Sequence, residues 1–415
     1  MKNTSITKII NGAVIATMDI SKDSFTGYLR CPFNGAERVV KKYSITMDEL
    51  MRFYQEAQAF KTKHGCSRII LGFESTGVYH VPIIQFFRDK PVELQQVNTL
   101  HVKRMKDITD NSPTKSDEKD PKVIADLIEL RRGLQVVIPT GEFLSMRTII
   151  QARERVIEHR TALTNQISNL VHILFPEFHR VFKDIHGKTA RMILRECPLP
   201  KQLVALGLDQ LSKKLYTTSR GRYGQDHARK LMIIARASLG VTDGLEHYVY
   251  EIHDLMSLCE TIEATIEAYE KKLSDLIRQT PLGRLLLSMR GLGVITITAI
   301  LGEYNGFAKF VTIAEVLKYA GMDITECSSG KRIGQRHLSK RGRSLLRKML
   351  YLATLNLVRK GSVFYEQYQA YINRNKKKKV ALIAIARKAL RTIFAMSKSM
   401  CEFRENYIRE YKTAA

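Results

Sequence analysis

The stretch Ala13-Val-Ile-Ala-Thr-Met18 is a short apolar run that leads directly into an acidic residue, Asp19. A short polar turn follows, and then Gly27–Arg30, so the segment predicts a β-hairpin. A second apolar and β-branched run, Ile69–Phe73, ends in another acid, Glu74, and is typical of a central strand. The pattern predicts a sheet with a carboxylate at the end of two strands.

Helix signals alternate with these strand signals up to about residue 135. Thr46-Met-Asp-Glu49 is a capping box, which predicts a helix from there to Gly65. The remaining expected elements are a helix from Thr76 or Gly77 toward Arg88, a weaker strand at Val92–Val97 and an amphipathic helix at Val123–Arg132 that ends at Gly133. The alternation predicts an α/β domain.

Two further acids, Asp117 and Asp120, stand three residues apart at the start of the last of these helices. Each of the four acids has a simpler explanation, such as capping a turn or complementing a helix dipole. Local competitors for a role in a site are Asp23, Asp107, Asp110, Glu118 and Asp126. Two strand-end acids and a helical i, i+3 pair are nevertheless how an RNase H-like nuclease builds its site. The four predict a pair of Mg²⁺ ions acting on a phosphodiester.

The composition indicates a nucleic-acid partner. Lys and Arg number 67 against 41 Asp and Glu, a formal net charge of +26 over 415 residues. Neutralising phosphates releases counterions and drives binding, whereas no run reaches the roughly 18 uncharged apolar residues of a spanning helix. The N-terminal residues lack the apolar core of a signal peptide, and the six cysteines are dispersed without a C-x-x-C pair. We therefore expect structural thiols and a cytoplasmic, nucleoid-associated protein with no membrane partner.

The middle of the chain has two long heptad-like patterns. One runs from Phe143 to Phe178, and the other, from Tyr248 to Leu276, alternates spacings of four and three like a coiled-coil seam. The two stretches pair either between protomers, which would make a dimer, or within one chain as a helical hairpin. Between them, Ser219-Arg-Gly-Arg-Tyr-Gly predicts a basic loop.

The last third is basic and helical. Gly291 and Gly293 form a Gly-x-Gly turn between two helices, which fits either a helix-hairpin-helix phosphate contact or a tight structural turn. A final helix carries one apolar face, formed by Leu382, Ile385, Ala386, Ala389, Leu390, Ile393 and Met396.

A serine-rich basic loop precedes that helix. Most of its charges fit a solvated phosphate-binding strip: Lys331, Arg332, Arg336, Lys340, Arg341 and Arg343. Ser328 or Ser329, beside Gly330, is a candidate nucleophile, whose weak hydroxyl would need a metal-polarised phosphate or a base. His337 fits a base, a phosphate contact or a structural residue.

Several motifs, taken in this order, resemble the DEDD transposases of bacterial insertion sequences. The N-terminal motifs are Met18-Asp19-Ile-Ser-Lys-Asp, Gly72-Phe-Glu74-Ser-Thr-Gly-Val-Tyr79 and Lys115-Ser-Asp117-Glu-Lys-Asp120. The C-terminal motifs are Arg290-Gly-Leu-Gly-Val-Ile-Thr, Leu317-Lys-Tyr-Ala-Gly321, Ser328-Ser-Gly-Lys-Arg and Leu338-Ser-Lys-Arg-Gly342. Pro121 and Arg290 depart from the residues usual in that family, and Pro at a first helical turn is well tolerated.

The resemblance implies a RuvC-like, RNase H-fold domain that holds Mg²⁺ through Asp19, Glu74, Asp117 and Asp120. It also implies a C-terminal domain in which Ser329, with Ser328 as the alternative, attacks DNA and forms a transient phosphoserine link. A structured guide RNA and a homo-oligomer, either dimer or tetramer, are further implications.

We expect an α/β plus α architecture of three parts. These are a metal-binding RuvC-like domain at 1–140, a helical coiled-coil region with a basic insertion at 141–280, and a helical domain with the serine at 281–415. The predicted function is RNA-guided cleavage and exchange of double-stranded DNA. One alternative is a RuvC-like junction resolvase that uses water, and another is a non-catalytic nucleic-acid-binding protein.

Overall fold

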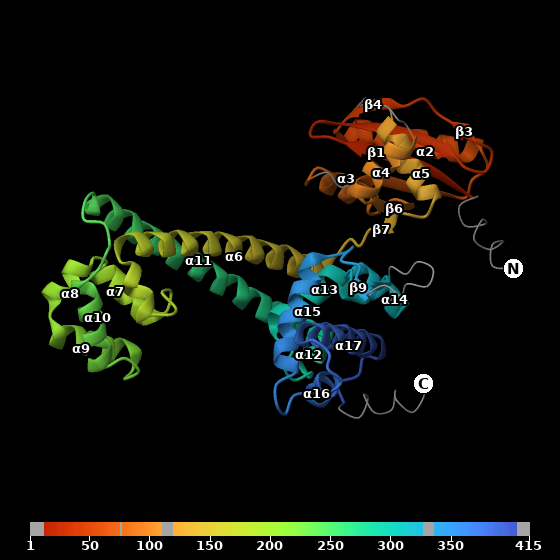
Figure 1. Cartoon of the computed structure of the whole chain (residues 1–415). Coiled ribbons are helices and arrows are strands. Elements are labelled where there is room, and N and C mark those ends of the chain that lie inside the picture. Colours follow the sequence, from red (N-terminus) through yellow and green to blue (C-terminus); the bar gives the residue numbers. More distant parts are fainter. Residues whose placement is uncertain (1–11, 75–76, 110–118, 327–335, 405–415) are drawn as a thin grey trace. The chain divides into compact units, whose positions relative to one another are not determined.

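The computed structural model of the chain describes residues 12–74, 77–109, 119–326 and 336–404 (Figure 1). It divides into two compact units, residues 1–138 and residues 139–415. The expected three-part division at residues 140 and 280 stays a prediction.

The first unit is built on a mixed sheet, which confirms the α/β prediction. Its strand order is β3-β2-β1-β5-β6-β7, with β4 also paired to β2. β1 and β2 form the predicted antiparallel hairpin, and β1, β5 and β6 run parallel. The strands are β1 (Ala13–Ile20), β2 (Ser24–Cys31), β3 (Ala36–Glu37), β4 (Lys41–Ser44), β5 (Arg68–Glu74), β6 (Val92–Val97) and β7 (Leu134–Gln135).

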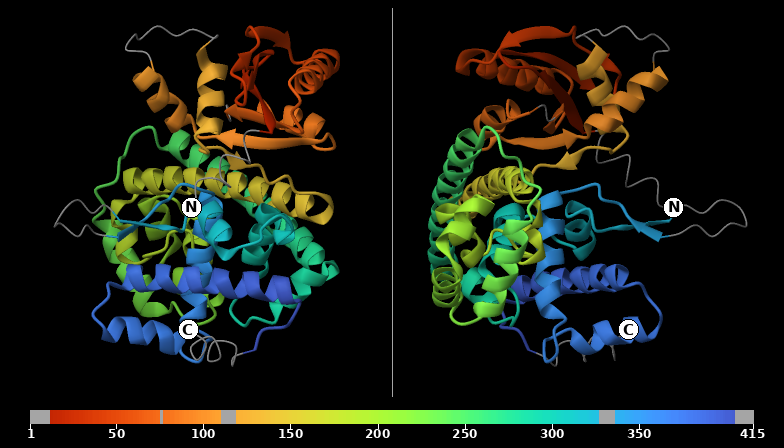
Figure 2. Two further views of the ribbon diagram at one scale, coloured as in Figure 1. Left: turned by 90° about the vertical axis from the view of Figure 1, so that its right-hand side faces the viewer. Right: turned by 60° about the vertical axis from the view of Figure 1, so that its left-hand side comes forward.

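Helices cover both faces of this sheet (Figure 2). α2 (Met47–Lys63) and α3 (His80–Phe87) pack on one face, and α4 (Thr99–Thr109) and α5 (Lys119–Glu129) pack on the other. Thr46 caps α2 as predicted, because its hydroxyl accepts a hydrogen bond from the Glu49 amide at 3.3 Å. α5 begins four residues before the predicted Val123, since Pro121 is compatible with a first helical turn. Asp120 therefore lies inside the helix.

The contact between α5 and the sheet depends on Gly72 in β5. A Cβ atom placed there would lie 1.9 Å from Cδ1 of Ile128 and 3.4 Å from Cγ2 of Ile124, both in α5. The helix thus approaches the strand more closely than any side chain at this position would allow.

We expect Gly72→Ala to destabilise the first unit by about 1–3 kcal/mol, the usual cost of overpacking a core. Ile128 offers a matched compensation, because its Cδ1 is the atom that the new methyl would meet. The double variant Gly72→Ala/Ile128→Val should recover part of the loss in urea unfolding. Equal free energies of unfolding for the single variant and the wild type would contradict this packing.

The second unit is organised around two long helices that lie side by side in every view (Figures 1 and 2). They are α6 (Gly141–Leu174) and α11 (Leu245–Gln279). They run antiparallel, since Ile150 packs with Leu273 near one end and Ile167 packs with Ile252 toward the other. The two heptad-like stretches therefore pair within the chain. The oligomeric state stays a prediction.

Shorter helices gather at both ends of this pair. At one end are η1 (Pro176–Arg180), α7 (Lys188–Glu196), α8 (Pro200–Leu206), α9 (Leu208–Ser219) and α10 (Gln225–Arg236). At the other are α12 (Pro281–Leu287), α13 (Val294–Tyr304), η2 (Asn305–Phe307), α14 (Ile313–Tyr319), α15 (Ser344–Leu357), α16 (Tyr365–Asn373) and α17 (Lys378–Ser399). The predicted apolar face of α17 is buried in full. Across the described ranges, none of the helices has the length and apolarity needed to span a membrane.

Candidate functional site

The carboxyl ends of β1 and β5 bring two of the predicted acids together. The parallel register pairs Met18 with Phe73, so the next residues, Asp19 and Glu74, stand level on neighbouring strands. Side chains alternate between the two faces of a strand, and residue 17 shares its face with residue 19. Since the Thr17 hydroxyl bonds to α5, Asp19 belongs to the face that α5 covers.

Glu74 belongs to the same face, because Gly72, two residues before it, contacts Ile128 of α5. Asp19 and Glu74 are both only partly buried, and Glu74 is the last residue of β5. β1 extends through Ile20, so Asp19 lies within the strand, one residue before its end.

A buried hydrogen bond places the first turn of α5 beside this strand end. The hydroxyl of Thr17 donates to the backbone oxygen of Pro121 at 2.7 Å. Thr17 is two residues from Asp19, and Pro121 directly follows Asp120. The hydrogen bond thus holds the first turn of α5, which carries Asp120, beside the strand that carries Asp19. Thr17 was not singled out from sequence, and the polar residue in an otherwise apolar strand is the signal that identifies it.

The site contains a cation that sequence reasoning missed. The ammonium group of Lys106, on α4, forms an ion pair with the carboxylate of Asp120. This pair shows that the position attracts positive charge. Within the part of the chain that the structure describes, no three His, Cys, Asp or Glu side chains lie close enough to ligate one ion. Asp117, the fourth predicted ligand, lies outside the described residues.

The donor set suits a hard divalent cation. Mg²⁺ prefers oxygen ligands and keeps several water molecules, so it needs few protein carboxylates. Asp19, Glu74 and Asp120 supply oxygens from three different elements on one face of the sheet. By the chemistry of their oxygen atoms these residues fit the predicted metal, and its binding here stays a prediction.

The acids that compete with these residues for a role in the site lie elsewhere or make other contacts. Asp126 and Glu129 of α5 both form ion pairs with Arg30 of β2, and the Glu129 pair measures 3.0 Å. That cluster fastens α5 to the hairpin. Asp23 is exposed in the β1–β2 turn, and Asp107 lies on α4. Asp110 and Glu118 lie outside the described residues.

The candidate serines fall on a hairpin in the second unit. β8 (Ile324–Glu326) pairs with β9 (Arg336–Leu338), and the loop between them, residues 327–335, lies outside the described residues. Ser328, Ser329, Lys331 and Arg332 are all in that loop. Sequence reasoning did not predict the hairpin, whose strands are only three residues long and largely exposed.

Two of the six predicted phosphate-binding cations already have carboxylate partners. Arg336 pairs with Glu326 at 2.7 Å across the hairpin, and Arg343 pairs with the buried Glu303 at 2.9 Å. Lys340 and Arg341, by contrast, are exposed at the base of the hairpin. These two are the better candidates for contact with a phosphate.

The base of the hairpin is fastened to the end of α14. The amide of Arg343 donates to the Tyr319 carbonyl at 3.0 Å, and the amide of Lys340 donates to the Gly321 carbonyl at 3.1 Å. Gly342 permits this approach, because a Cβ atom there would lie 2.4 Å from the Tyr319 oxygen. The base of the hairpin that leads to the candidate serines is thus well packed.

The Gly-x-Gly turn lies between α12 and α13, as predicted. Gly293 is the residue before α13, and Gly291 has a φ of +95°. A Cβ atom at Gly291 would lie 3.1 Å from Cδ2 of Leu357 in α15, which supports the interpretation as a tight structural turn. A phosphate contact at Gly291 and Gly293 stays a prediction.

Comparison with known proteins identifies the family. Residues 16–176 match a family model described as a DEDD transposase, and residues 283–369 match one described as the IS116/IS110/IS902 transposase family. The chain belongs to the DEDD transposase family of insertion elements. The resemblance predicted from the motifs is confirmed. As a member, the protein is a transposase, an enzyme of DNA recombination.

Two relatives are proteins of insertion elements. A 44.8 kDa uncharacterized protein of element IS116 from Streptomyces clavuligerus is 23% identical over 286 residues, which cover 68% of this chain and 71% of the relative. A 43.6 kDa uncharacterized protein of element IS110 from Streptomyces coelicolor is 24% identical over 315 residues, 74% of this chain and 76% of the relative.

A comparison of structures finds an exopolyphosphatase from Cytophaga hutchinsonii. The likeness covers 58% of this chain and 90% of the exopolyphosphatase at 10% identity, with a TM-score of 0.18.

Proposed function

We propose that this transposase catalyses RNA-guided cleavage and exchange of DNA strands at the ends of its insertion element. The observation that supports the proposal most is the gathering of Asp19, Glu74 and Asp120 at one end and on one face of the sheet. All of that sheet except the first three residues of β1 lies within the segment matched by the DEDD model. Its hairpin and parallel strands fit an RNase H-like, RuvC-like domain.

In this proposal, Asp19, Glu74, Asp117 and Asp120 hold two Mg²⁺ ions. The bound metal supplies stabilisation of charge on the attacking and leaving oxygens of the phosphodiester. With a metal held by the carboxylates, Lys106 would be released from Asp120. Its side chain, partly exposed on α4, would then be able to contact a DNA phosphate near the carboxylates.

The hydroxyl oxygen of Ser329 attacks the phosphorus of the scissile phosphodiester. A bond forms between Oγ and phosphorus as the bond to the leaving deoxyribose oxygen breaks. The serine hydroxyl gives up its proton and the leaving oxygen takes one up, so the step is balanced. The phosphoserine conserves the energy of the diester, so attack by another strand's hydroxyl rejoins DNA without ATP. Lys331, Arg332, Lys340 and Arg341 contact the flanking phosphates.

The proposed partners are double-stranded DNA, a structured guide RNA and further copies of this chain, in the bacterial cytoplasm. Guidance by base pairing would place sequence choice in the RNA. We also propose that Ser329 and the carboxylates meet only when the protein has assembled with these partners, so an isolated protomer would not nick DNA.

A denaturing assay for covalent protein–DNA adducts tests this mechanism. The protein is incubated with Mg²⁺, DNA of the element's end and RNA transcribed from its flanks. We expect an adduct with wild type and with Ser328→Ala, and none with Ser329→Ala or Asp120→Asn. Ser328→Ala is the matched control, because it removes an identical hydroxyl one residue away.

Free cleaved ends without an adduct, made equally by both serine variants, would instead identify a nuclease that activates water. DNA binding that survives loss of every carboxylate, with no cleavage by the wild type, would identify a non-catalytic binding protein.

A further inference from the structure

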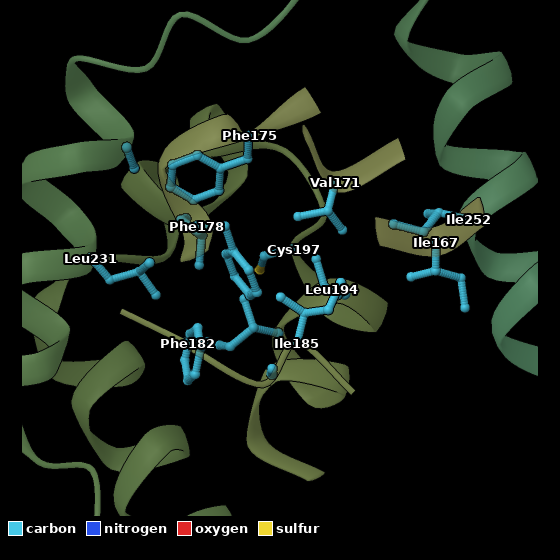
Figure 3. Packing of buried hydrophobic residues seen from close by; sticks show 14 of the residues in the cluster. Ile167, Val171, Phe175, Phe178, Phe182, Ile185, Leu194, Cys197, Leu231 and Ile252 are labelled. Atoms are coloured by element: carbon cyan, nitrogen blue, oxygen red, sulfur yellow. The ribbon is translucent and has the colours of Figure 1, made fainter. Parts of the chain in front are cut away.

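The helices α7 to α10 form a small cluster at one end of the α6–α11 pair. Its core includes Phe175, Phe178 and Phe182 together with Leu211, Leu215 and Leu231, all of them almost fully buried (Figure 3). Most of this cluster lies between the two segments matched by family models, which end at residue 176 and resume at residue 283. Membership of the family therefore assigns this cluster no role.

The turn between α9 and α10 is held in one conformation by hydrogen bonds. The Ser219 hydroxyl accepts a bond from the Tyr223 amide at 2.8 Å, and the Gly221 amide donates to the Tyr216 carbonyl at 2.9 Å. Arg220 has a φ of +54°, the left-handed region that L residues rarely adopt. Arg220 is the C-cap residue of α9, and a left-handed residue commonly ends a helix, so this conformation turns the chain from α9 toward α10.

Aromatic contacts fasten the same turn to the core. The ring of Tyr223 packs on Phe182 with centroids 5.3 Å apart, and the Arg222 guanidinium lies 5.8 Å from the Tyr223 centroid. Arg222 is nevertheless exposed, as is Arg220. Tyr216, at 60% exposure, stands beside Gly221. The turn thus presents two arginines and one tyrosine ring on a rigid support.

The charges around the turn are mostly uncompensated. Lys214 pairs with Glu196 at 2.6 Å, and Arg229 stands 3.9 Å from Asp226. The other cations of α9, the turn and α10 form no ion pair with a carboxylate in the described part of the chain, and all are exposed: Lys213, Arg220, Arg222, Lys230 and Arg236. Evolution of a structural turn alone does not require such a concentration of unpaired positive charge.

We propose that the α9–α10 turn binds the sugar-phosphate backbone of a nucleic acid, with Arg220 and Arg222 on phosphates and Tyr216 against a base or sugar. Exposed arginines match phosphate oxygens, and an aromatic ring beside them adds a stacking surface that an acidic peptide does not use. The site needs neither the carboxylates nor Ser329, so it goes beyond the proposed function and can fail independently of it.

Fluorescence anisotropy of the full-length chain tests the site, with labelled RNA duplex and DNA duplex of the same sequence and no divalent metal. The test variant is Arg220→Gly/Arg222→Gln, in which glycine also relieves the left-handed strain. The control is Lys188→Gln/Lys201→Gln, which removes the same charge from exposed positions on α7 and α8. A second pair, Lys213→Gln/Lys230→Gln, leaves the turn itself intact.

We expect the turn variant to weaken binding about tenfold and to lower the slope of log K against log salt by about two, one for each lost phosphate contact. The Lys213/Lys230 pair should act in the same direction, and the Lys188/Lys201 control should stay close to wild type. A loss of affinity for RNA alone, for DNA alone or for both identifies the nucleic acid that the turn binds.

Unchanged affinity and slope in both the turn variant and the Lys213/Lys230 pair would overturn the proposal. An equal loss in the Lys188/Lys201 control would also overturn it, because binding would then depend only on total charge. Circular dichroism checks that the turn variant is folded. If the turn variant is not folded, the affinity and salt slope of the Lys213/Lys230 pair decide whether the turn binds nucleic acid.

Discussion

We expect Asp19→Asn to lower the rate of DNA cleavage by about a thousandfold or more. An isosteric amide keeps the shape of the side chain but removes the negative charge that a metal ligand supplies. Metal ions contribute several kcal/mol to the stabilisation of such transition states, and about 4 kcal/mol corresponds to a thousandfold in rate. The measurement is the single-turnover rate on DNA of the element's end, with Mg²⁺ and RNA, under conditions in which the wild type cleaves.

The chain offers a matched control four residues away. Asp23 is exposed in the β1–β2 turn, on the same hairpin as Asp19. Asp23→Asn makes the same chemical change and should leave the rate within about twofold, since surface substitutions away from special features change little. Cleavage by Asp19→Asn at a rate close to that of Asp23→Asn would rule out a metal-binding role for Asp19.

We expect the other large effect from substitution of a buried carboxylate in the second unit. Glu303, at the end of α13, is 2% exposed. It accepts a hydrogen bond from Gln151 of α6 at 3.1 Å and lies 3.4 Å from the Arg147 guanidinium of the same helix. Its other ion pair, with Arg343 at the start of α15, measures 2.9 Å. One side chain thus joins three helices near the base of the β8–β9 hairpin.

Glu303→Ala should destabilise the second unit by about 3 kcal/mol, because it leaves Gln151 and two arginines without their buried partner. Glu303→Gln, which keeps the volume and one acceptor oxygen, should cost less than half as much. Glu366→Ala, at an exposed position on α16, is the control and should stay within about 0.5 kcal/mol of wild type. Urea unfolding followed by helical circular dichroism measures all three, and similar values for Glu303→Ala and Glu366→Ala would refute the role.

The same residue makes stability depend on pH. Burial raises the pKa of Glu303 above its ordinary value, and this effect outweighs the opposing influence of Arg147 and of the hydrogen bond from Gln151. The folded chain therefore binds this proton more tightly than the unfolded chain does. The resulting stabilisation is fully present below the ordinary glutamate pKa and is lost as pH rises through the raised one. Over that window, wild type should lose stability relative to Glu303→Gln, and parallel pH profiles would contradict the assignment.

Much of the local structure could be predicted because it depends on neighbours in sequence. Apolar runs bounded by turns identified the β1–β2 hairpin and β5, and the Thr46 capping box identified α2. The face of α17 followed from helical periodicity alone. The family followed from motifs at both ends of the chain.

Other features depend on contacts that no local pattern contains. The β8–β9 hairpin is too short and too exposed to have an apolar alternation, and it forms because Gly342 lets its base approach Tyr319. The ion pair of Lys106 with Asp120 joins two helices, and sequence spacing does not indicate it. Whether the two heptad-like stretches pair within the chain was equally open, since a seam specifies an apolar partner but not which chain supplies it.

The sequence by itself determined which carboxylates are candidates, that the partner is a polyanion, and to which family the chain belongs, because residue types, charge and motif order are all written along the chain. Only the tertiary structure decided that Asp19 and Glu74 share a level and a face, since strand register is a property of two strands. It alone placed the first turn of α5, which carries Asp120, beside β1 through the bond from Thr17 to Pro121, 104 residues apart. It also turned an unassigned basic loop into a rigid surface, because the aromatic core that supports Arg222 exists only once α7 to α10 have packed.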